Sequence, residues 1–313
     1  MYSNFIVAAQ AILPIFILIG LGMLVRRSGL ISAEENTKLN KMVFLLFFST
    51  LIFNNIYESE LGDILEPKLM IFGGLGVLAS FILATVFVMK VEKDNKKRGA
   101  LIQALFRSNF VILGMPITLN ILGEENAAVT VMMITVVVPL FNILAVVELE
   151  YFRGGRVSIS HLLLQLIKNP LMDGAILALV FKLFNIHLPV VLEEVVSDMA
   201  SVATPMALII LGISFEFGQI KECGRNLWLA VIGKLIVIPA IMLSLGALLG
   251  FRGPEFVCLI GIFASPTAVA SYTMAVSMES DGVLAGNAVI MSSFASCVTM
   301  FGWIFLFKSL GMF

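Results

Sequence analysis

The chain consists of long apolar runs that short polar or charged segments separate. A helix needs about 20 apolar residues to cross the ~30 Å hydrocarbon layer of a bilayer. Ten runs reach roughly that length, at residues 4–26, 38–57, 69–90, 99–122, 127–152, 161–184, 191–215, 226–250, 255–278 and 282–308. The pattern predicts an all-α polytopic membrane protein with ten transmembrane helices and no room for a soluble domain.

Composition supports this class of protein. Hydrophobic residues make up 59% of the chain and charged residues only 13%, whereas a soluble domain carries about 25% charged residues. The formal net charge of -1 gives no basis for binding nucleic acid. The three cysteines, Cys223, Cys258 and Cys297, lack the short paired spacing of a zinc or redox site. We therefore expect the lipid bilayer as surroundings and predict neither a metal nor a cofactor.

The basic residues between the runs predict the orientation, because cytoplasmic connections are enriched in Lys and Arg. If the first run crosses from outside to inside, the inner connections hold fourteen cations: Arg26, Arg27, Lys38, Lys41, Lys90, Lys93, Lys96, Lys97, Arg98, Arg153, Arg156, Lys168, Lys221 and Arg225. The outer side holds four: Lys68, Lys182, Arg252 and Lys308. We expect a protein of the cytoplasmic membrane with both termini outside the cell.

The number of runs suggests an internal duplication. Five spans per half is an odd number, so two related halves, 1–157 and 158–313, would have opposite orientations, as in many secondary transporters. A weak echo between the first and sixth runs aligns Pro14 with Pro170 and Leu30 with Ile186. This pattern predicts two inverted five-helix repeats.

The fourth run of each half carries a proline near its middle. The two segments read ALFRSNFVILGMPITLNILG, with Pro116, and LIGIFASPTAVASYTMAVSM, with Pro266. Proline removes a helical donor and clashes with the preceding turn, and broken helices at matching places in two halves are typical of a substrate site. A pair of simple proline kinks is the alternative.

Polar residues inside these runs are candidates for the site. Arg107 follows Arg98 by nine residues, which places it about 13–14 Å into the ~30 Å core. A charge at that depth lines a pathway or pairs with an acid, so Arg107 binds substrate or forms a structural pair with Asp173 or another acid. Asp173 and Lys234 are similarly deep, as counter-ions, substrate contacts or, for Asp173, a proton carrier.

Four further polar residues suit more local roles. The amide of Asn109 suits either holding a carboxylate or capping the freed backbone of the ninth run. Asn142 suits a helix–helix hydrogen bond better than a ligand contact. Glu148 and Glu150 are expected to reach the inner interface of the membrane.

The order of these motifs resembles the auxin efflux carrier family, which includes plant PIN-type carriers and bacterial permeases for small carboxylates. The matching segments are LNKMVFLLFFSTLIF, RSNFVILGMPITLNILG, VVPLFNI, LIKNPLMDGAILAL, ATPMALIILGIS, KLIVIPAIM and ASPTAVASYTMA. Ser49 and Thr50 stand where the family usually has a proline. Plant carriers have other residues in place of Arg107, so their auxin specificity cannot be carried over.

The resemblance implies ten helices in two inverted repeats, with helices 4 and 9 unwound and crossing at mid-membrane. It places the first crossover at Asn109 to Pro116, including Gly114, and the second at Ser265, Pro266 and Thr267. It also implies a transport domain, a scaffold that often forms a homodimer, and a small organic anion such as a carboxylate as substrate. The expected function is an elevator-type or alternating-access secondary transporter.

Other functions fit less well. The two histidines, His161 and His187, fall at predicted span ends, so no deep base supports an enzyme. A cation–proton antiporter on this fold would place acids at the crossover, where this chain has Asn109, Ser265 and Thr267. A passive channel stays open as an alternative.

Overall fold

The computed structural model covers residues 1–313 and describes residues 2–58, 66–122, 127–153, 170–216 and 218–313. Arg156, His161 and Lys168 lie outside these ranges. The described part of the chain is helical and contains no strand, apart from one isolated bridge. The elements are α1 (Tyr2–Arg27), α2 (Ala33–Met42), η1 (Val43–Phe48), α3 (Ser49–Tyr57), α4 (Pro67–Val91), α5 (Asn95–Phe106), η2 (Phe110–Gly114), α6 (Met115–Leu122), α7 (Ala127–Arg153), α9 (Pro170–Leu183), α10 (Val190–Ser214), α11 (Gln219–Ile232), η4 (Gly233–Val237), α12 (Ile238–Leu248), α13 (Gly253–Ala264), α14 (Ala270–Ser277) and α15 (Gly282–Ser309), with η marking short π-helical turns.

Each predicted run is helical wherever the structure describes it, with breaks in the fourth and ninth runs. Six helices among the described residues are long and apolar enough to cross a membrane: Ala33–Tyr57, Pro67–Val91, Met132–Arg153, Val190–Ser214, Glu222–Leu248 and Gly282–Ser309. The all-α, multi-helix class is therefore confirmed. The number of ten membrane crossings stays a prediction.

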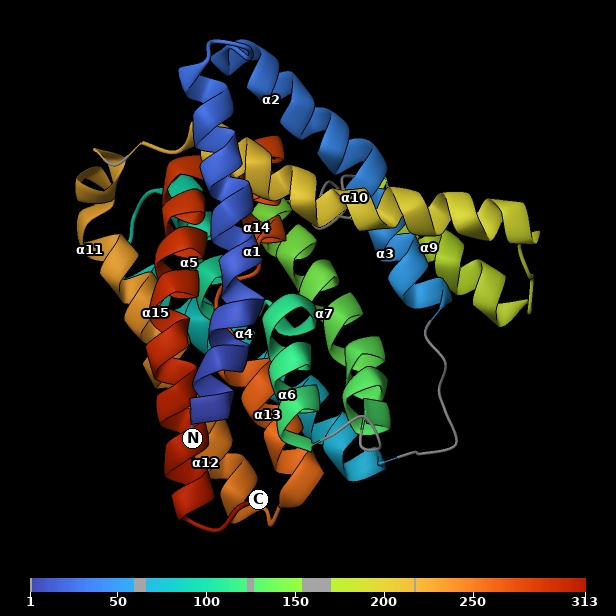
Figure 1. Ribbon diagram of the computed structural model, residues 1–313, viewed down its shortest axis with the longest axis vertical. Coiled ribbons are helices and arrows are strands. Elements are labelled where there is room, and N and C mark those ends of the chain that lie inside the picture. Colours follow the sequence, from blue (N-terminus) through green and yellow to red (C-terminus); the bar gives the residue numbers. More distant parts are fainter. Residues whose placement is uncertain (1, 59–65, 123–126, 154–169, 217) are drawn as a thin grey trace.

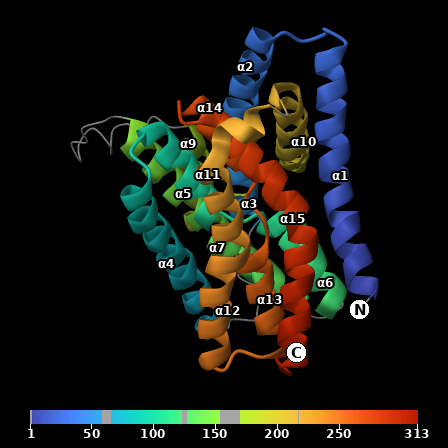
Figure 2. The same ribbon diagram turned by 90° about the vertical axis from the view of Figure 1, so that its left-hand side faces the viewer.

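The helices form a bundle from which one group projects. Figure 1 shows α3, α9 and α10 extending to one side of the bundle that α4, α5, α12, α13 and α15 build, and Figure 2 shows α1 along the outside of this bundle. The beginning of α1 and the end of α15 lie at the same end of the molecule (Figure 1). The turn between α1 and α2 lies at the opposite end.

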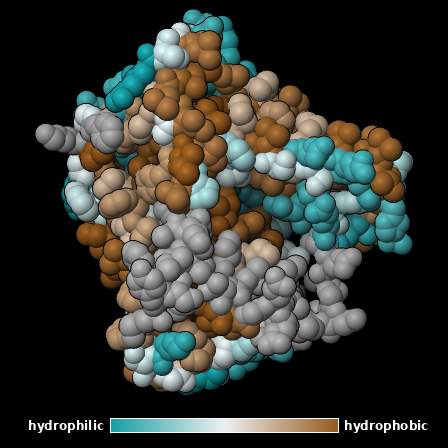
Figure 3. Space-filling view, in the orientation of Figure 1, coloured by the Kyte–Doolittle hydropathy of each residue, from teal (hydrophilic) through white to brown (hydrophobic). Residues whose placement is uncertain are grey.

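Large apolar side chains cover much of the surface. Figure 3 shows hydrophobic residues in broad patches across the visible face, with hydrophilic residues gathered mainly near its edges. Leu13, Leu75, Val191 and Val298 are each at least 60% exposed. Apolar patches of this extent are unusual on soluble monomers, so these faces suit contact with lipid.

Two glycines allow α1 and α10 to touch backbone to backbone. A Cβ at Gly22 would lie 2.1 Å from the carbonyl oxygen of Ile209, and one at Gly212 would lie 2.1 Å from that of Ile19. Small residues at helix interfaces permit this approach in membranes, where packing rather than hydrophobic burial drives association. The two halves of the chain are therefore joined tightly at this contact.

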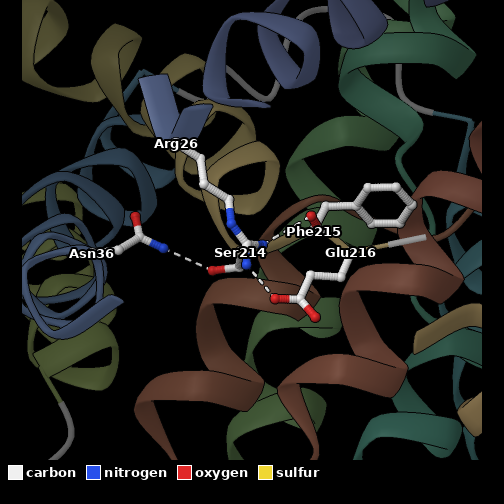
Figure 4. Close-up of polar contacts among 5 residues, drawn as sticks. All are labelled: Arg26, Asn36, Ser214, Phe215 and Glu216. Carbon is white, nitrogen blue, oxygen red and sulfur yellow. Dashed lines mark hydrogen bonds and ion pairs between the residues drawn. The ribbon is translucent and has the colours of Figure 1, made fainter. Parts of the chain in front are cut away.

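Polar contacts fix the end of the same helix pair. Figure 4 shows Arg26 of α1 reaching the carbonyl of Phe215, at 3.2 Å, and the carboxylate of Glu216. Asn36 of α2 donates to the hydroxyl of Ser214 at 2.7 Å (Figure 4). These contacts join α1, α2 and the end of α10.

The turn between α4 and α5 sets the start of the helix that leads to the site. Asp94 caps α5 by accepting from the backbone N–H of Lys96 at 2.9 Å. Glu92 accepts from the backbone N–H groups of Asp94 and Lys93, at 2.9 and 2.7 Å, and from Asn226. These bonds favour the ionised carboxylate and hold the pKa of Glu92 below its ordinary value.

Candidate functional site

Two helices break opposite one another, and their extended segments pair. Helix α5 ends at Phe106 and α13 ends at Ala264. Between the segments that follow, Ser108 and Thr267 form an antiparallel bridge. The N–H of Asn109 donates to the carbonyl of Pro266 at 2.8 Å, and that of Ala268 donates to the carbonyl of Arg107 at 3.3 Å. Buried backbone groups need such partners, because lipid supplies none.

The break after α13 has a local cause, whereas the break after α5 contains no proline. Pro266 has no N–H and disfavours the α region for the preceding residue, and Ser265 has φ -63° and ψ 150°. In the other segment the backbone leaves the helix at Arg107, Ser108 and Asn109 and becomes π-helical at Phe110.

The extended part of the fourth run therefore differs from the expected Asn109–Pro116. Pro116 lies in α6, which follows the π-helical turn η2 without a break, and its side chain lies outside the described atoms. Gly114 is a packing position, because a Cβ there would lie 2.6 Å from the carbonyl oxygen of Gly261.

Hydroxyl groups and one lysine hold the paired segments together. Ser108 donates to the carbonyl of Ser265 at 3.2 Å and accepts from Lys234 Nζ at 3.1 Å. Thr267 Oγ1 donates to the carbonyl of Ala104 at 2.9 Å, and Ser265 Oγ donates to that of Gly261 at 2.6 Å. Ser265 and Thr267 are expected to bind substrate, but their hydroxyl groups donate hydrogen bonds to backbone carbonyls of the protein.

A cavity of about 120 Å³ lies beside the paired segments. Its polar lining consists of Asn55, Arg107, Ser108, Asn109, Asn142 and Thr204, and Phe48, Ile52, Phe110 and Phe141 are among its apolar lining. The structure therefore brings together Arg107, Asn109 and Asn142 of the predicted residues. Asn55 and Thr204 were missed, although each is a polar residue inside an apolar run, and such residues usually face the interior.

Arg107 lies buried at the wall of this cavity, with 4% of its surface exposed. Its guanidinium donates to Oε1 of Gln103 at 3.4 Å and to Oδ1 of Asn142. Asn142 thereby links α7 to α5 and also lines the cavity. In the part of the chain that the structure describes, no carboxylate is hydrogen-bonded to Arg107, so its hydrogen bonds go to neutral groups.

Asn109 contributes an unused donor. Its side chain is 5% exposed, and Nδ2 has no hydrogen-bond partner among the described residues. The backbone N–H of Asn109, rather than its side-chain amide, donates to the carbonyl of Pro266 in the other broken segment. The Nδ2 donor is thus unsatisfied at a residue that lines the cavity.

Asp173 lies elsewhere than expected. It is exposed in the first turn of α9 and lines a separate, mostly apolar cavity with Ser49, Thr50 and Phe181. No contact joins it to Arg107 within the described ranges. Glu148, whose expected position at the inner interface stays a prediction, is 2% exposed and interacts electrostatically with Arg107.

The helical bundle, its apolar surface and the buried polar cavity together fit the class of membrane transport proteins. The family model described as "Membrane transport protein" matches residues 7–156 and 154–304. The chain belongs to this family, the auxin efflux carrier family. The resemblance seen in the sequence motifs is thereby confirmed.

Two archaeal relatives match along nearly the whole chain. An "Uncharacterized transporter" of Methanothermobacter thermautotrophicus is 23% identical over 304 residues, which are 96% of this chain and 98% of the relative. The "Uncharacterized transporter MJ1031" of Methanocaldococcus jannaschii is 24% identical over 314 residues, covering 95% of this chain and 98% of the relative. Both are named for transport and not for a chemical reaction.

Proposed function

We propose that the protein is a secondary transporter that moves a small organic anion, such as a carboxylate, across the cytoplasmic membrane. The observation that carries the proposal is the cavity wall at the broken helix α5. There, the guanidinium of Arg107 is buried and has no hydrogen-bonded carboxylate among the described residues. Asn109, two residues later in the chain, has a side-chain amide nitrogen that has no partner among these residues. Guanidinium and amide donors together suit a planar carboxylate.

The electrostatics of the broken segments favour an anion over a cation. Arg107 and Lys234 are both buried there, at 4% and 1% exposure. The first N–H groups of a helix lack intrahelical acceptors, and the helix dipole adds about half a positive charge at its start. Helix α14 and the η2–α6 segment both begin at the pairing. A cation–proton antiporter would need acids in these places, so we disfavour that alternative.

Helix contacts support two inverted repeats with broken helices that cross. The contacts occur in matched pairs, in which each span of one half corresponds to the span five places later. The matched pairs are α1–α10 with α9–α3, α4–α5 with α12–α13, α4–α7 with α11–α15, and α5–α7 with α13–α15. Such symmetry is the basis of alternating access in many carriers, and we propose it here for residues 1–157 and 158–313.

The membrane orientation can be measured by cysteine labelling. We expect both termini outside the cell, because fourteen basic residues flank the inner side of the predicted spans and four flank the outer side. In a variant without the native cysteines, a cysteine at Lys96 should react only after the membrane is permeabilised. A cysteine at Arg252 should react in intact cells. Reaction of both from outside would contradict this topology.

Transport itself can be tested in liposomes. A thermal-shift screen of purified protein against mono- and dicarboxylates should find anions that raise the melting temperature, because a ligand that binds only the folded state stabilises it by mass action. A radiolabelled hit should then accumulate in liposomes preloaded with the unlabelled anion. A passive channel would let the label equilibrate without this transient accumulation, so counterflow separates a carrier from a channel.

A further inference from the structure

We propose that Glu148 is a proton carrier coupled to the anion site. In this scheme the Glu148 carboxylate and the transported anion alternate as the negative partner of Arg107, and Glu148 takes up one proton when an anion binds. The inference rests on the proposed anion function and adds its coupling ion.

Glu148 is a buried acid without hydrogen-bond partners. Its exposed fraction is 2%, and neither carboxylate oxygen is hydrogen-bonded within the described part of the chain. A Cβ built on Gly99 would lie 3.2 Å from Glu148 Oε1 and 2.8 Å from Ser280 Oγ, so the carboxyl group faces the beginning of α5. A buried carboxylate without donors is costly unless a nearby charge or a proton neutralises it.

The neighbouring acid behaves differently. Glu150 is 7% exposed and lies 3.8 Å from the guanidinium of Arg153, which also bonds Glu279 at the inner end of the bundle. Two acids on the same helix thus have contrasting surroundings. Glu150 has an ion pair that explains its burial, and Glu148 has none with any residue that the structure describes.

A row of buried polar groups leads from Glu148 to the cavity. Gly99, Gln103 and Arg107 follow one another at intervals of four residues, which places Gly99 and Gln103 on one face of α5 and Arg107 directly after the end of this helix. Gln103 is fully buried, its Oε1 accepts from Arg107, and its Nε2 has no partner among the described residues. Arg107 in turn bonds Asn142 at the cavity wall.

Several charged residues occupy the elements that pack against α7. They are Lys68 and Lys90 on α4; Lys96, Lys97 and Arg98 on α5, with Arg107 directly after its end; Glu150 and Arg153 on α7 itself; Asp173 and Lys182 on α9; and Glu255 on α13, with Glu92, Lys93 and Asp94 in the turn before α5 and Glu279 and Asp281 in the turn beside Gly99. Arg107 is the charged group with a resolved electrostatic interaction with Glu148. Among these charged groups, Arg107 is therefore the one whose availability affects the charge state of the buried Glu148.

The bound anion and the ionised Glu148 compete for the positive charge of Arg107, and this competition couples anion binding to proton uptake. Without substrate, the positive charge of Arg107 compensates the negative charge of the ionised Glu148. An anion in the cavity takes up the charge of Arg107 at closer range, which leaves Glu148 uncompensated, and the carboxylate then accepts a proton. The bound state gains one negative charge and one proton, so movement of a monovalent anion with this proton is electroneutral. A dianion with one proton carries a net negative charge.

The first arm of the test needs no ligand. Infrared spectra of wild type and Arg107→Gln at neutral pH should differ by the C=O band of a protonated carboxyl group, present in the variant. The band should be absent from the Arg107→Gln/Glu148→Gln double variant and retained in Arg107→Gln/Glu150→Gln. Absence of the band, or its persistence in the first double variant, would overturn the proposal. If the arginine variants do not fold, the second arm decides.

The second arm uses acetate, lactate, succinate and malate as probes on wild type in weakly buffered detergent solution with a pH-sensitive dye. A probe that raises the melting temperature should also cause uptake of about one proton per anion bound. Glu148→Gln should abolish this uptake, and Glu150→Gln should leave it unchanged. Binding without proton uptake rejects the coupling and leaves the anion function intact. No binding of any probe rejects the anion function and the coupling with it.

Discussion

Replacing Arg107 by glutamine is expected to lower the affinity for a carboxylate by about 10- to 100-fold and to abolish counterflow at low substrate concentration. A hydrogen bond to a charged group contributes about 1.5–3 kcal/mol, and 1.4 kcal/mol corresponds to a tenfold change in affinity. Arg107→Lys should give an intermediate loss, because an ammonium keeps the charge without the planar pair of donors. Thermal shift and counterflow with the same carboxylate measure both effects.

The control must separate binding from folding, because Arg107 also bonds Gln103 and Asn142. Arg252→Gln is a matched loss of a guanidinium at an exposed turn, where the side chain donates to the carbonyls of Ala247 and Phe251. This variant should transport like wild type. Wild-type transport by a well-folded Arg107→Gln variant would show that the anion is held by the helix ends and Asn109 alone.

Helix positions were the part of the fold that the sequence predicted well. The run predicted at 69–90 corresponds to Pro67–Val91, and that at 191–215 corresponds to Val190–Ser214. The match is close because the length of an apolar run in a membrane protein is set by bilayer thickness. Start signals such as Pro67 in the first turn then fix the ends within a few residues.

The position of the break in the fourth run could not be read from local sequence. Proline was the expected cause, yet Pro116 lies inside α6 and the chain leaves the helix at Arg107–Asn109. This break is held by bonds to Pro266 and Ala268, more than 150 residues away in the chain. Long-range pairing of this kind overrides helix propensity, which is a weak local preference.

Depth along a predicted helix did not show where the acidic side chains lie in the structure. Counting residues from a span end gives the position along the axis, but it does not say which side of the helix faces the core. Asp173 is exposed for this reason, and Glu148 is buried against Gly99 in the first half of α5. The candidate pair of Arg107 with Asp173 is replaced by the electrostatic interaction of Arg107 with Glu148.

Asn109→Ala is expected to reduce carboxylate affinity by about 10- to 100-fold while leaving the fold stable. The affinity loss follows from removing a donor to a charged acceptor, which contributes about 1.5–3 kcal/mol. Stability should change little, because Nδ2 has no partner in the described structure and the backbone of Asn109, which the substitution keeps, makes the bond to Pro266. Thermal shift without and with the carboxylate measures the two quantities separately.

Two further variants test whether the Asn109 amide acts as a donor. Asn109→Asp keeps the size of the side chain but exchanges the donor for a negative charge within the anion cavity. It should therefore bind more weakly than Asn109→Ala, since like charges in a buried site repel strongly. Asn226→Ala removes an amide whose partner is Glu92, outside the cavity, and should bind like wild type. If Asn109→Asp instead binds as well as wild type, the cavity does not discriminate by charge at this position and the occupant is not an anion held there.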